Sequence, residues 1–315
     1  MAIDASVLKA LEAVVALRRD EPLSRHTTIG IGGPADAFVT VQTASQLAQV
    51  LRIAHTAGVP VFMLGSGSNI VVGDRGLRGV VIENNAAGVV PTITKPQPSD
   101  RAVPTQHLFR IESGASFAAV SRQLALAGYA GLEWACGIPG TLGGAVVYNA
   151  GAYGGCLGDV LQRIGVWDGQ RGEVVFEASE LGLVYRGSAF TRGLMAGKAV
   201  LWAEVLLWDG DVEALKERIA DYDARRLKAQ PRGRNAGSFF KNPPGQPAWR
   251  LIDAVGLRGS RVGGAEFSEK HCNFLINAGG ATAADVVALK DLAQSRVREQ
   301  FGVVLDNEVT LVGEF

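Results

Sequence analysis

Residues 135–155 of the sequence are Ala-Cys-Gly-Ile-Pro-Gly-Thr-Leu-Gly-Gly-Ala-Val-Val-Tyr-Asn-Ala-Gly-Ala-Tyr-Gly-Gly, with seven glycines and one proline. Glycine adopts positive φ angles readily, and its missing side chain lets backbone N–H groups approach a phosphate or a heterocycle. A second glycine-rich stretch, Gly65-Ser-Gly-Ser-Asn-Ile70, follows the apolar segment 59–64, which is typical of a buried strand. The two stretches together favour a nucleotide-cofactor site over tight turns, the alternative that glycine clustering alone leaves open.

The composition indicates a globular protein with more than one core. The chain has 315 residues, 47% of them hydrophobic, and a mean hydropathy of +0.15. Lys and Arg total 31, as do Asp and Glu, so we expect neither nucleic acid nor a membrane surface as a partner. No uncharged apolar stretch approaches 18 residues and the N-terminus lacks a signal-peptide pattern, so we expect a cytoplasmic protein.

Neither cysteines nor histidines are spaced as metal ligands. Cys136, Cys156 and Cys272 form no CxxC pair, and the four histidines include no HxxxH pair. We therefore expect no metal site and no disulfide framework, which fits a reducing compartment. The glycine-rich stretches also match neither GxxxxGK[ST] nor a complete GxGxxG fingerprint.

Hydrophobic periodicity predicts a chain of mixed helices and strands. Helices are expected over residues 6–18, 43–54, 116–126, 212–229 and 283–301. Strands are expected over residues 59–64, 71–72, 80–82, 108–111, 173–176, 199–208, 274–276 and 303–312. The proline-rich segment 91–107 is interpreted as a surface insertion.

Seven blocks of sequence, in a fixed order across nearly the whole chain, resemble a known family. The blocks are His26-Thr-Thr-Ile-Gly-Ile-Gly-Gly-Pro-Ala35, Leu64-Gly-Ser-Gly-Ser-Asn69, Gly137-Ile-Pro-Gly-Thr-Leu-Gly-Gly-Ala145, Asn149-Ala-Gly-Ala-Tyr-Gly154, Tyr185-Arg-Gly-Ser188, Ala236-Gly-Ser-Phe-Phe-Lys-Asn-Pro243 and Asn307-Glu-Val309. The sequence resembles the UDP-N-acetylenolpyruvoylglucosamine reductases (UDP-N-acetylmuramate dehydrogenases, MurB). Because only 52 residues separate Arg186 from Ser238, it resembles the compact subclass, which lacks an inserted substrate-covering segment.

The resemblance implies an α+β fold. Two FAD-binding subdomains of the PCMH/vanillyl-alcohol-oxidase type are expected at 1–90 and 91–208, with a C-terminal α/β substrate-binding domain at 209–315. It also implies bound FAD, NADPH as co-substrate, and reduction of UDP-N-acetylglucosamine enolpyruvate to UDP-N-acetylmuramate in peptidoglycan precursor synthesis. The expected partner is thus a small UDP-sugar, and we expect a monomer.

The resemblance assigns the glycine-rich stretches to the cofactor. The implied cofactor-binding residues are Gly65, Ser66, Gly67, Ser68, Asn69, Ile70, Gly137, Ile138, Pro139, Gly140, Thr141, Gly143, Gly144, Ala145, Asn149 and Gly151.

Three residues are implied to be catalytic, and the chemistry explains their types. Arg186 has a planar fork for the substrate carboxylate, where negative charge develops. Ser238 would protonate the carbanionic carbon, and Glu308 would act with Arg186 on the carboxylate, for which its pKa should be raised. The residues alone leave other roles open: a structural salt bridge for Arg186, a turn or cap for Ser238, and for Glu308 an exposed strand position that shares its side with Asp306.

Lys228, Asn242 and His271 match substrate-side positions of the family, although His271 is equally compatible with a buried structural histidine. Two other functions stay open on the residues alone. One is a different flavoprotein oxidase or dehydrogenase of the same FAD-binding fold, and the other is a non-catalytic nucleotide-sugar binding protein.

Overall fold

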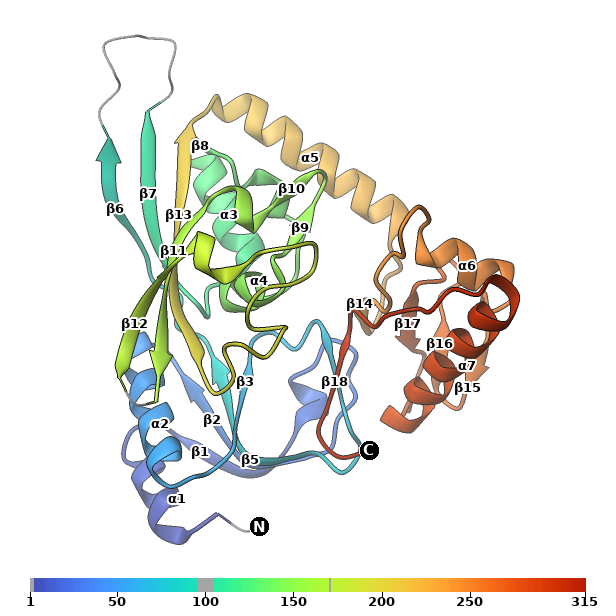
Figure 1. Cartoon of the computed structure of the whole chain (residues 1–315), viewed down its shortest axis with the longest axis horizontal. Helices are drawn as coiled ribbons and strands as arrows, with labels where there is room; N and C mark the ends of the chain where they lie inside the picture. The colour runs from blue at the N-terminus through green and yellow to red at the C-terminus, as the bar shows by residue number, and fades with distance from the viewer. Residues whose placement is uncertain (1–2, 96–104, 170) are drawn as a thin grey trace.

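The computed structural model describes residues 3–95, 105–169 and 171–315 of the chain. The N-terminal part is built on a four-stranded sheet (Figure 1). The strands, in sheet order, are β1 (Leu17–Pro22), β2 (Pro34–Val41), β5 (Leu77–Asn84) and β3 (Val61–Leu64). β2, β5 and β3 are parallel, and β1 is antiparallel to β2. Helices α1 (Ala5–Glu12) and α2 (Ala44–Thr56) bury their apolar faces against this sheet.

The larger sheet lies in the middle of the chain and is antiparallel. Its strands, in order, are β12 (Gly172–Glu177), β11 (Leu161–Asp168), β13 (Ala199–Asp209), β7 (Gln106–Glu112) and β6 (Val89–Lys95), with β8 (Tyr129–Ala130) paired to β13. Helices α3 (Phe117–Leu126) and α4 (Leu142–Tyr148) pack on this sheet around the buried Phe117 and Val146. Short strands β9 (Gly151–Ala152) and β10 (Gly155–Cys156) form a hairpin after α4.

Helix α5 (Val212–Ala229) leads from the large sheet to the C-terminal part (Figure 1). There the antiparallel strands, in order, are β14 (Asn235–Ser238), β17 (Phe274–Asn277), β16 (Ala265–Phe267) and β15 (Arg261–Val262). Helices α6 (Ala248–Ala254) and α7 (Ala283–Phe301) complete this part, around a separate apolar core. The described residues also contain four 3₁₀ turns: η1 (Leu23–Arg25), η2 (Glu133–Ala135), η3 (Leu157–Asp159) and η4 (Ala178–Leu181).

The end of the chain returns from the C-terminal part to the N-terminal part. Strand β18 (Thr310–Val312) pairs in parallel with β4 (Ile70–Val72), and Figure 1 shows the C-terminus beside that strand. The carboxylate of Asp74 accepts hydrogen bonds from the first backbone N–H groups of α7, those of Ala283 and Ala284, at 2.8 and 3.1 Å. These contacts fix residue 308 next to the loop that begins at Gly65.

The helices with clear local start signals are confirmed. Thr43, Ser116 and Thr282 each accept a hydrogen bond at the N-terminus of α2, α3 and α7, as their hydroxyl groups predict. Helix α5 spans the 212–229 range expected from its charged, periodic sequence. A hydroxyl followed by an apolar repeat is a local signal, which explains why these bounds were predictable.

Three expectations are wrong or incomplete. The helix expected over 6–18 ends at Glu12, because Leu17–Pro22 pairs with β2 instead. The strand expected over 303–312 is limited to β18, since the oxygen of Phe239 accepts from two successive N–H groups, those of Glu308 and Val309, and breaks the ladder. Within 91–107, residues 91–95 and 106–107 belong to β6 and β7 rather than to an irregular insertion, and residues 96–104 lie outside the described residues.

Candidate active site

A cavity of about 660 Å³ lies where the N-terminal sheet, the glycine-rich stretch and the C-terminal part meet. Its volume falls in the range of about 300–1,000 Å³ that is typical of small-molecule sites. Its wall contains the loop after β3, the segment from Ile138 to Tyr153, the last turn of α5 and the end of β14. Segments far apart in the sequence therefore share one site.

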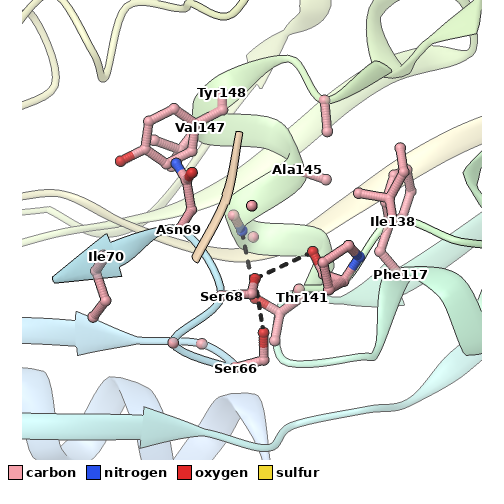
Figure 2. Close-up of a pocket in the computed structure, with 18 of the residues that line it drawn as sticks. Ser66, Ser68, Asn69, Ile70, Phe117, Ile138, Thr141, Ala145, Val147 and Tyr148 are labelled. Carbon is pink, nitrogen blue, oxygen red and sulfur yellow. Dashed lines mark hydrogen bonds between the residues drawn. The ribbon is translucent and has the colours of Figure 1, made fainter. Parts of the chain in front are cut away.

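The loop Gly65–Asn69 follows the carboxyl end of β3, which is where ligands bind in parallel sheets. Gly67 has φ +61°, and a Cβ there would lie 2.1 Å from the carbonyl oxygen of His26. Only glycine fits this position. Ser68 donates from Oγ to the carbonyl oxygen of Pro139 at 3.3 Å, which joins the two glycine-rich stretches. Figure 2 shows Ser66 and Ser68 directed toward the segment that carries Thr141.

The cavity wall is suited to a large anionic cofactor. The backbone N–H groups of residues 66–69 donate no hydrogen bond within the described part of the chain, so they are available to a ligand. A Cβ added to Gly144 in α4 would meet only Oγ1 of Thr141, at 3.8 Å, and would therefore stand in the cavity. Free donors and absent side chains are what a dinucleotide needs, and the residues present fit FAD.

Most of the predicted cofactor-binding residues line this cavity. They are Gly65, Ser66, Gly67, Ser68, Asn69, Ile70, Ile138, Pro139, Gly140, Thr141, Gly143, Gly144, Ala145 and Gly151. Gly137 and Asn149 do not line it. Gly137 lies against the side chain of Arg226, so that a Cβ added to the glycine would stand 2.9 Å from Cδ of the arginine. The side-chain amide of Asn149 is hydrogen bonded within the protein.

Arg186 enters the cavity from a tight turn in which Val184 and Gly187 exchange two backbone hydrogen bonds. The residue has φ +53°, a conformation that non-glycine residues rarely adopt. Its Nη1 donates to the carbonyl oxygen of Gly151 at 3.0 Å. The guanidinium group is thus held at the cavity wall by its backbone and by one direct hydrogen bond.

Glu308 faces Arg186, with 2.6 Å between Oε1 and Nε. The contact is an ion pair without hydrogen-bond geometry, because the buried Nε of Arg186 has no aligned acceptor within the described residues. Burial raises the pKa of the Glu308 carboxyl, although Arg186 and Lys241 act in the opposite direction. This is the direction that the sequence predicts.

The backbone of Glu308 is held from two sides. Its N–H donates to the oxygen of Phe239 at 2.8 Å, and its carbonyl oxygen accepts from Nδ2 of Asn69 at 3.1 Å. Asp306, two residues earlier, is exposed, so the two carboxylates do not share a strand face as the expected period predicts.

Ser238 ends β14 and lines the cavity. The pairing of β14 with β17 shifts register between Asn235 and Ser238, and Gly237 in between has φ +84°. Such bulges redirect the next side chain. The Ser238 hydroxyl forms no hydrogen bond within the described residues, so its proton is available to a ligand.

The three residues predicted to contact the substrate do not line the cavity. Lys228 and Asn242 are exposed, and Oδ1 of Asn242 accepts from the N–H of Ala248 at the start of α6. His271 packs against the rings of Trp249 and Phe274, and burial lowers its pKa. Of these neighbours, Phe274 reaches the cavity wall.

Sequence reasoning missed several polar wall residues. Arg225 and Arg226 line the cavity from the last turns of α5, and burial lowers the pKa of Arg226. Tyr148 and Thr310 also line it, and their hydroxyl oxygens lie 2.7 Å apart across two parts of the fold. The sequence carries no local signal for Arg226, because an arginine on a charged helix is typical of a solvent-exposed face.

Two family models match different parts of the chain. Residues 35–176 match the family model of an FAD binding domain, and residues 229–312 match that of the UDP-N-acetylenolpyruvoylglucosamine reductase C-terminal domain. The fold and the family matches thus define an FAD-dependent oxidoreductase with a separate C-terminal domain. The predicted α+β fold class is confirmed.

Whole-chain relatives narrow the class to one family. UDP-N-acetylenolpyruvoylglucosamine reductase of Desulfosudis oleivorans is 43% identical over 300 residues, covering 94% of each chain. That of Geobacter sulfurreducens is 41% identical over 307 residues, covering 96% of this chain and 97% of the relative. The crystal structure of UDP-N-acetylenolpyruvylglucosamine reductase (MurB) from Thermus caldophilus matches with a TM-score of 0.76 and 35% identity, over 95% of this chain and all of the other. The chain belongs to the UDP-N-acetylenolpyruvoylglucosamine reductase family.

Proposed function

We propose that the protein reduces UDP-N-acetylglucosamine enolpyruvate to UDP-N-acetylmuramate with NADPH as reductant. The observation that carries the proposal is the convergence of Arg186, Glu308 and Ser238, from three separate segments, on the cavity whose glycine-rich wall fits FAD. Bound FAD would accept a hydride from NADPH and pass it to the terminal carbon of the enolpyruvyl group. The chain itself must then bind the carboxylate, stabilise the developing charge and supply one proton.

Arg186 is assigned the carboxylate. Hydride addition leaves negative charge shared between the α-carbon and the carboxylate of the substrate, and a guanidinium group keeps its positive charge at any working pH. The buried Nε–H of Arg186 lacks an aligned acceptor within the described residues, so a substrate carboxylate would satisfy it.

Ser238 is assigned the proton that completes the reaction at the α-carbon. An enolate-like carbon is strongly basic, so a hydroxyl group is acidic enough if it is correctly placed. The bulge at Gly237 supplies that placement, since it directs the side chain of Ser238 into the cavity.

Glu308 is assigned a role in its protonated form. A neutral carboxyl group donates a hydrogen bond to the substrate carboxylate, whereas an ionised one repels it. Burial favours the neutral form of Glu308, and the Nε of Arg186 at 2.6 Å places this carboxyl beside the proposed carboxylate site.

The phosphates of the nucleotides need cations as well. Arg225 and Arg226 stand in the cavity wall and fit a diphosphate better than Lys228, which is exposed and outside the wall. Lys228, Asn242 and His271 stay predicted substrate contacts. They would require a movement toward the ligand of α5, of the segment after β14 and of the segment between β16 and β17, respectively.

An anaerobic titration tests cofactor, reductant and acceptor together. The purified protein is expected to carry flavin absorbance, to lose it on addition of NADPH, and to recover it on addition of the enolpyruvyl substrate. Rapid recovery in air without that substrate would favour an oxidase of the same fold. A colourless protein that binds UDP-sugars would favour the non-catalytic alternative.

Two further expectations belong to this proposal. NADPH and nucleotide sugars are cytoplasmic metabolites, so we propose a cytoplasmic enzyme, and we propose that it acts as a monomer because the catalytic residues of the site come from one chain. Among the described residues, no helix has the length and apolarity that a membrane span requires. Sedimentation of the FAD-loaded protein gives the oligomeric state.

A further inference from the structure

Two of the sequence motifs meet directly behind the catalytic arginine. The segment Val147–Gly151 begins in the last turn of α4, and the segment Val184–Ser188 forms the turn that carries Arg186. Three side-chain hydrogen bonds join the two segments: Oγ of Ser188 donates to the oxygen of Val147 at 2.6 Å, Nδ2 of Asn149 donates to the oxygen of Val184 at 3.1 Å, and Nη1 of Arg186 donates to the oxygen of Gly151 at 3.0 Å.

Both polar atoms of the Asn149 side chain have a protein partner. Besides its bond to Val184, its Oδ1 accepts from the N–H of Gly158 at 2.9 Å, and only 7% of the residue is exposed. A carbonyl oxygen can only accept and an N–H can only donate, so these partners fix the orientation of the amide. Because Asn149 also does not line the cavity, both polar atoms of its side chain are directed to protein partners rather than to a cofactor.

The backbone at Asn149 explains the residue type. Asn149 ends α4 with φ +43° and ψ +60°, a left-handed conformation that asparagine adopts more easily than most residues. The conformation turns the chain so that the side chain points back to Val184. Glycine would fit the backbone but would lose both hydrogen bonds.

The turn needs such support because its conformation is strained. Arg186 has φ +53°, and strained residues of this kind persist only where the surrounding structure fixes them. Ser188 supplies a second anchor, since its hydroxyl is fully buried and also accepts from the N–H of Phe190. The two hydrogen bonds thus hold the chain at Val184, before Arg186, and at Ser188, after it.

We propose that Asn149 is a positioning residue for Arg186, with Ser188 as the second anchor, and that Asn149 does not contact the cofactor. The inference rests on the proposed function, in which Arg186 binds the substrate carboxylate. Loss of the Asn149 donor would let the turn relax and would displace the guanidinium group from the cavity wall. Misplacement by about 1 Å costs on the order of 100-fold in rate.

The test uses Asn149→Asp and Asn149→Gly in the FAD-loaded protein. Asn149→Asp keeps the shape and the acceptor for Gly158 but puts two oxygens face to face at Val184. Asn149→Gly removes the side chain without backbone strain. In both, reoxidation of the reduced flavin by the enolpyruvyl substrate should slow by about 10- to 100-fold, with flavin content and reduction by NADPH within about twofold of wild type. Loss of flavin in proportion to activity would instead assign Asn149 to the cofactor and overturn the proposal.

A double-mutant cycle with Arg186→Ala shows whether Asn149 acts through the arginine. Once the guanidinium group is gone its position is irrelevant, so adding Asn149→Asp should slow single-turnover reoxidation by less than about twofold. Full, independent losses in the double variant would contradict the proposal.

Hydrogen exchange separates this inference from the function itself. Peptides covering residues 183–190 should exchange faster in Asn149→Asp while the rest of the chain is unchanged, whatever reaction the protein catalyses. Unchanged protection there would overturn the proposal, whereas failure of the wild type to react with the enolpyruvyl substrate would overturn only the proposed function.

Asn277→Asp is the matched control. Nδ2 of Asn277 also donates to a backbone oxygen, that of Ile29, at 3.0 Å, and its Oδ1 also accepts from backbone N–H groups, but the residue does not line the cavity. This variant should leave reoxidation and the exchange of residues 183–190 unchanged. An equal slowing in the control would show that any lost amide bond has this effect.

Discussion

Arg186 and Glu308 form a partly buried ion pair in which Nε lies 2.6 Å from Oε1, and they come from different parts of the fold. The arginine stands on a turn between β12 and β13 of the large sheet, whereas the glutamate stands on the segment that returns from the C-terminal part to pair with β4. The pair exists only because that segment crosses back. Substrate carboxylate and Glu308 therefore compete for one guanidinium group, which makes the protonation state of Glu308 important.

Replacement of Arg186 by lysine should abolish efficient use of the enolpyruvyl substrate. An ammonium group is a point charge and cannot reproduce the planar fork that binds a carboxylate through two parallel bonds. We expect kcat/KM for this substrate to fall by about 100-fold or more, with NADPH still reducing the flavin. Steady-state and stopped-flow rates check this, and near-normal turnover would exclude the carboxylate assignment.

Ser238→Ala should separate the two half-reactions. Reduction by NADPH needs no proton from Ser238, whereas completion of the lactyl product does. We expect reoxidation to slow by about 10²- to 10⁴-fold, the usual range for a lost general acid, with unchanged reduction by NADPH. Equal losses in both half-reactions, measured by stopped-flow absorbance, would contradict the assigned role.

The rate of reoxidation should fall as the pH rises through the raised pKa of Glu308. Burial lifts this pKa above the ordinary 4.5, so the protonated, hydrogen-bond-donating form persists to higher pH than for an exposed glutamate. Above the raised pKa, the ionised group both repels the substrate carboxylate and retains Arg186. Glu308→Gln cannot titrate, so the fall in rate with rising pH should disappear from its pH–rate profile. An unchanged fall in rate would assign that pH dependence to another group.

Local signals in the sequence were sufficient for the helices, but not for the strands that depend on distant partners. Thr43, Ser116 and Thr282 mark helix starts with their own hydroxyl groups. The helix predicted over 6–18 extended too far, into the first two residues of β1, because Val14 and Val15 continue an apolar repeat. The pairing of β1 with β2 is decided elsewhere in the chain. Strand β11 was not predicted, although it pairs with both β12 and β13.

The site likewise combines residues that local sequence signals predict with residues whose role depends on distant partners. The two glycine-rich stretches predicted two segments of the cavity wall, because absent side chains leave a trace in the sequence itself. Asn149 was grouped with the cofactor because it adjoins those glycines, and only the packing of the 184–187 turn behind it reveals a protein partner. Arg226 was overlooked since an arginine on a charged helix carries no local mark of burial.

Gly144→Val should weaken FAD binding without unfolding the protein. Gly144 is helical and lines the cavity, and an added Cβ has Oγ1 of Thr141, at 3.8 Å, as its one close neighbour among the described residues, so we expect a valine side chain to project into the cavity. We expect at least about a 10-fold loss of flavin affinity, because the added methyl groups would occupy space that the bound cofactor needs. Flavin fluorescence titration measures this, with circular dichroism to confirm the fold. Gly144→Ala is the control, and an equal loss with the single methyl group would point to backbone damage instead.

Glu204→Gln should lower stability while leaving both half-reactions intact. The side chain of Glu204 is fully buried and lies outside the cavity wall. Its carboxylate accepts hydrogen bonds from Arg110 at 2.8 and 3.0 Å and from Arg163 at 2.5 Å. Burial alone would raise the pKa of this carboxyl, but the two arginines outweigh it and hold the pKa below 4.5. The wild-type protein therefore loses this stabilisation as the pH falls below about 4.5 through the depressed folded-state pKa.

The neutral amide of Glu204→Gln keeps the shape but removes the charge and turns one acceptor into a donor that faces a guanidinium group. We expect a loss of about 2 kcal/mol in the free energy of unfolding at neutral pH, less than the 3–5 kcal/mol of a fully buried pair. The discount follows because the side chains of Arg110 and Arg163 are 41% and 40% exposed, so water screens both. Urea unfolding of the variant and the wild type at pH 7 and pH 4 measures the difference, which should shrink at the lower pH. A difference that stays constant with pH would show that packing, rather than the charge of Glu204, stabilises this part of the sheet.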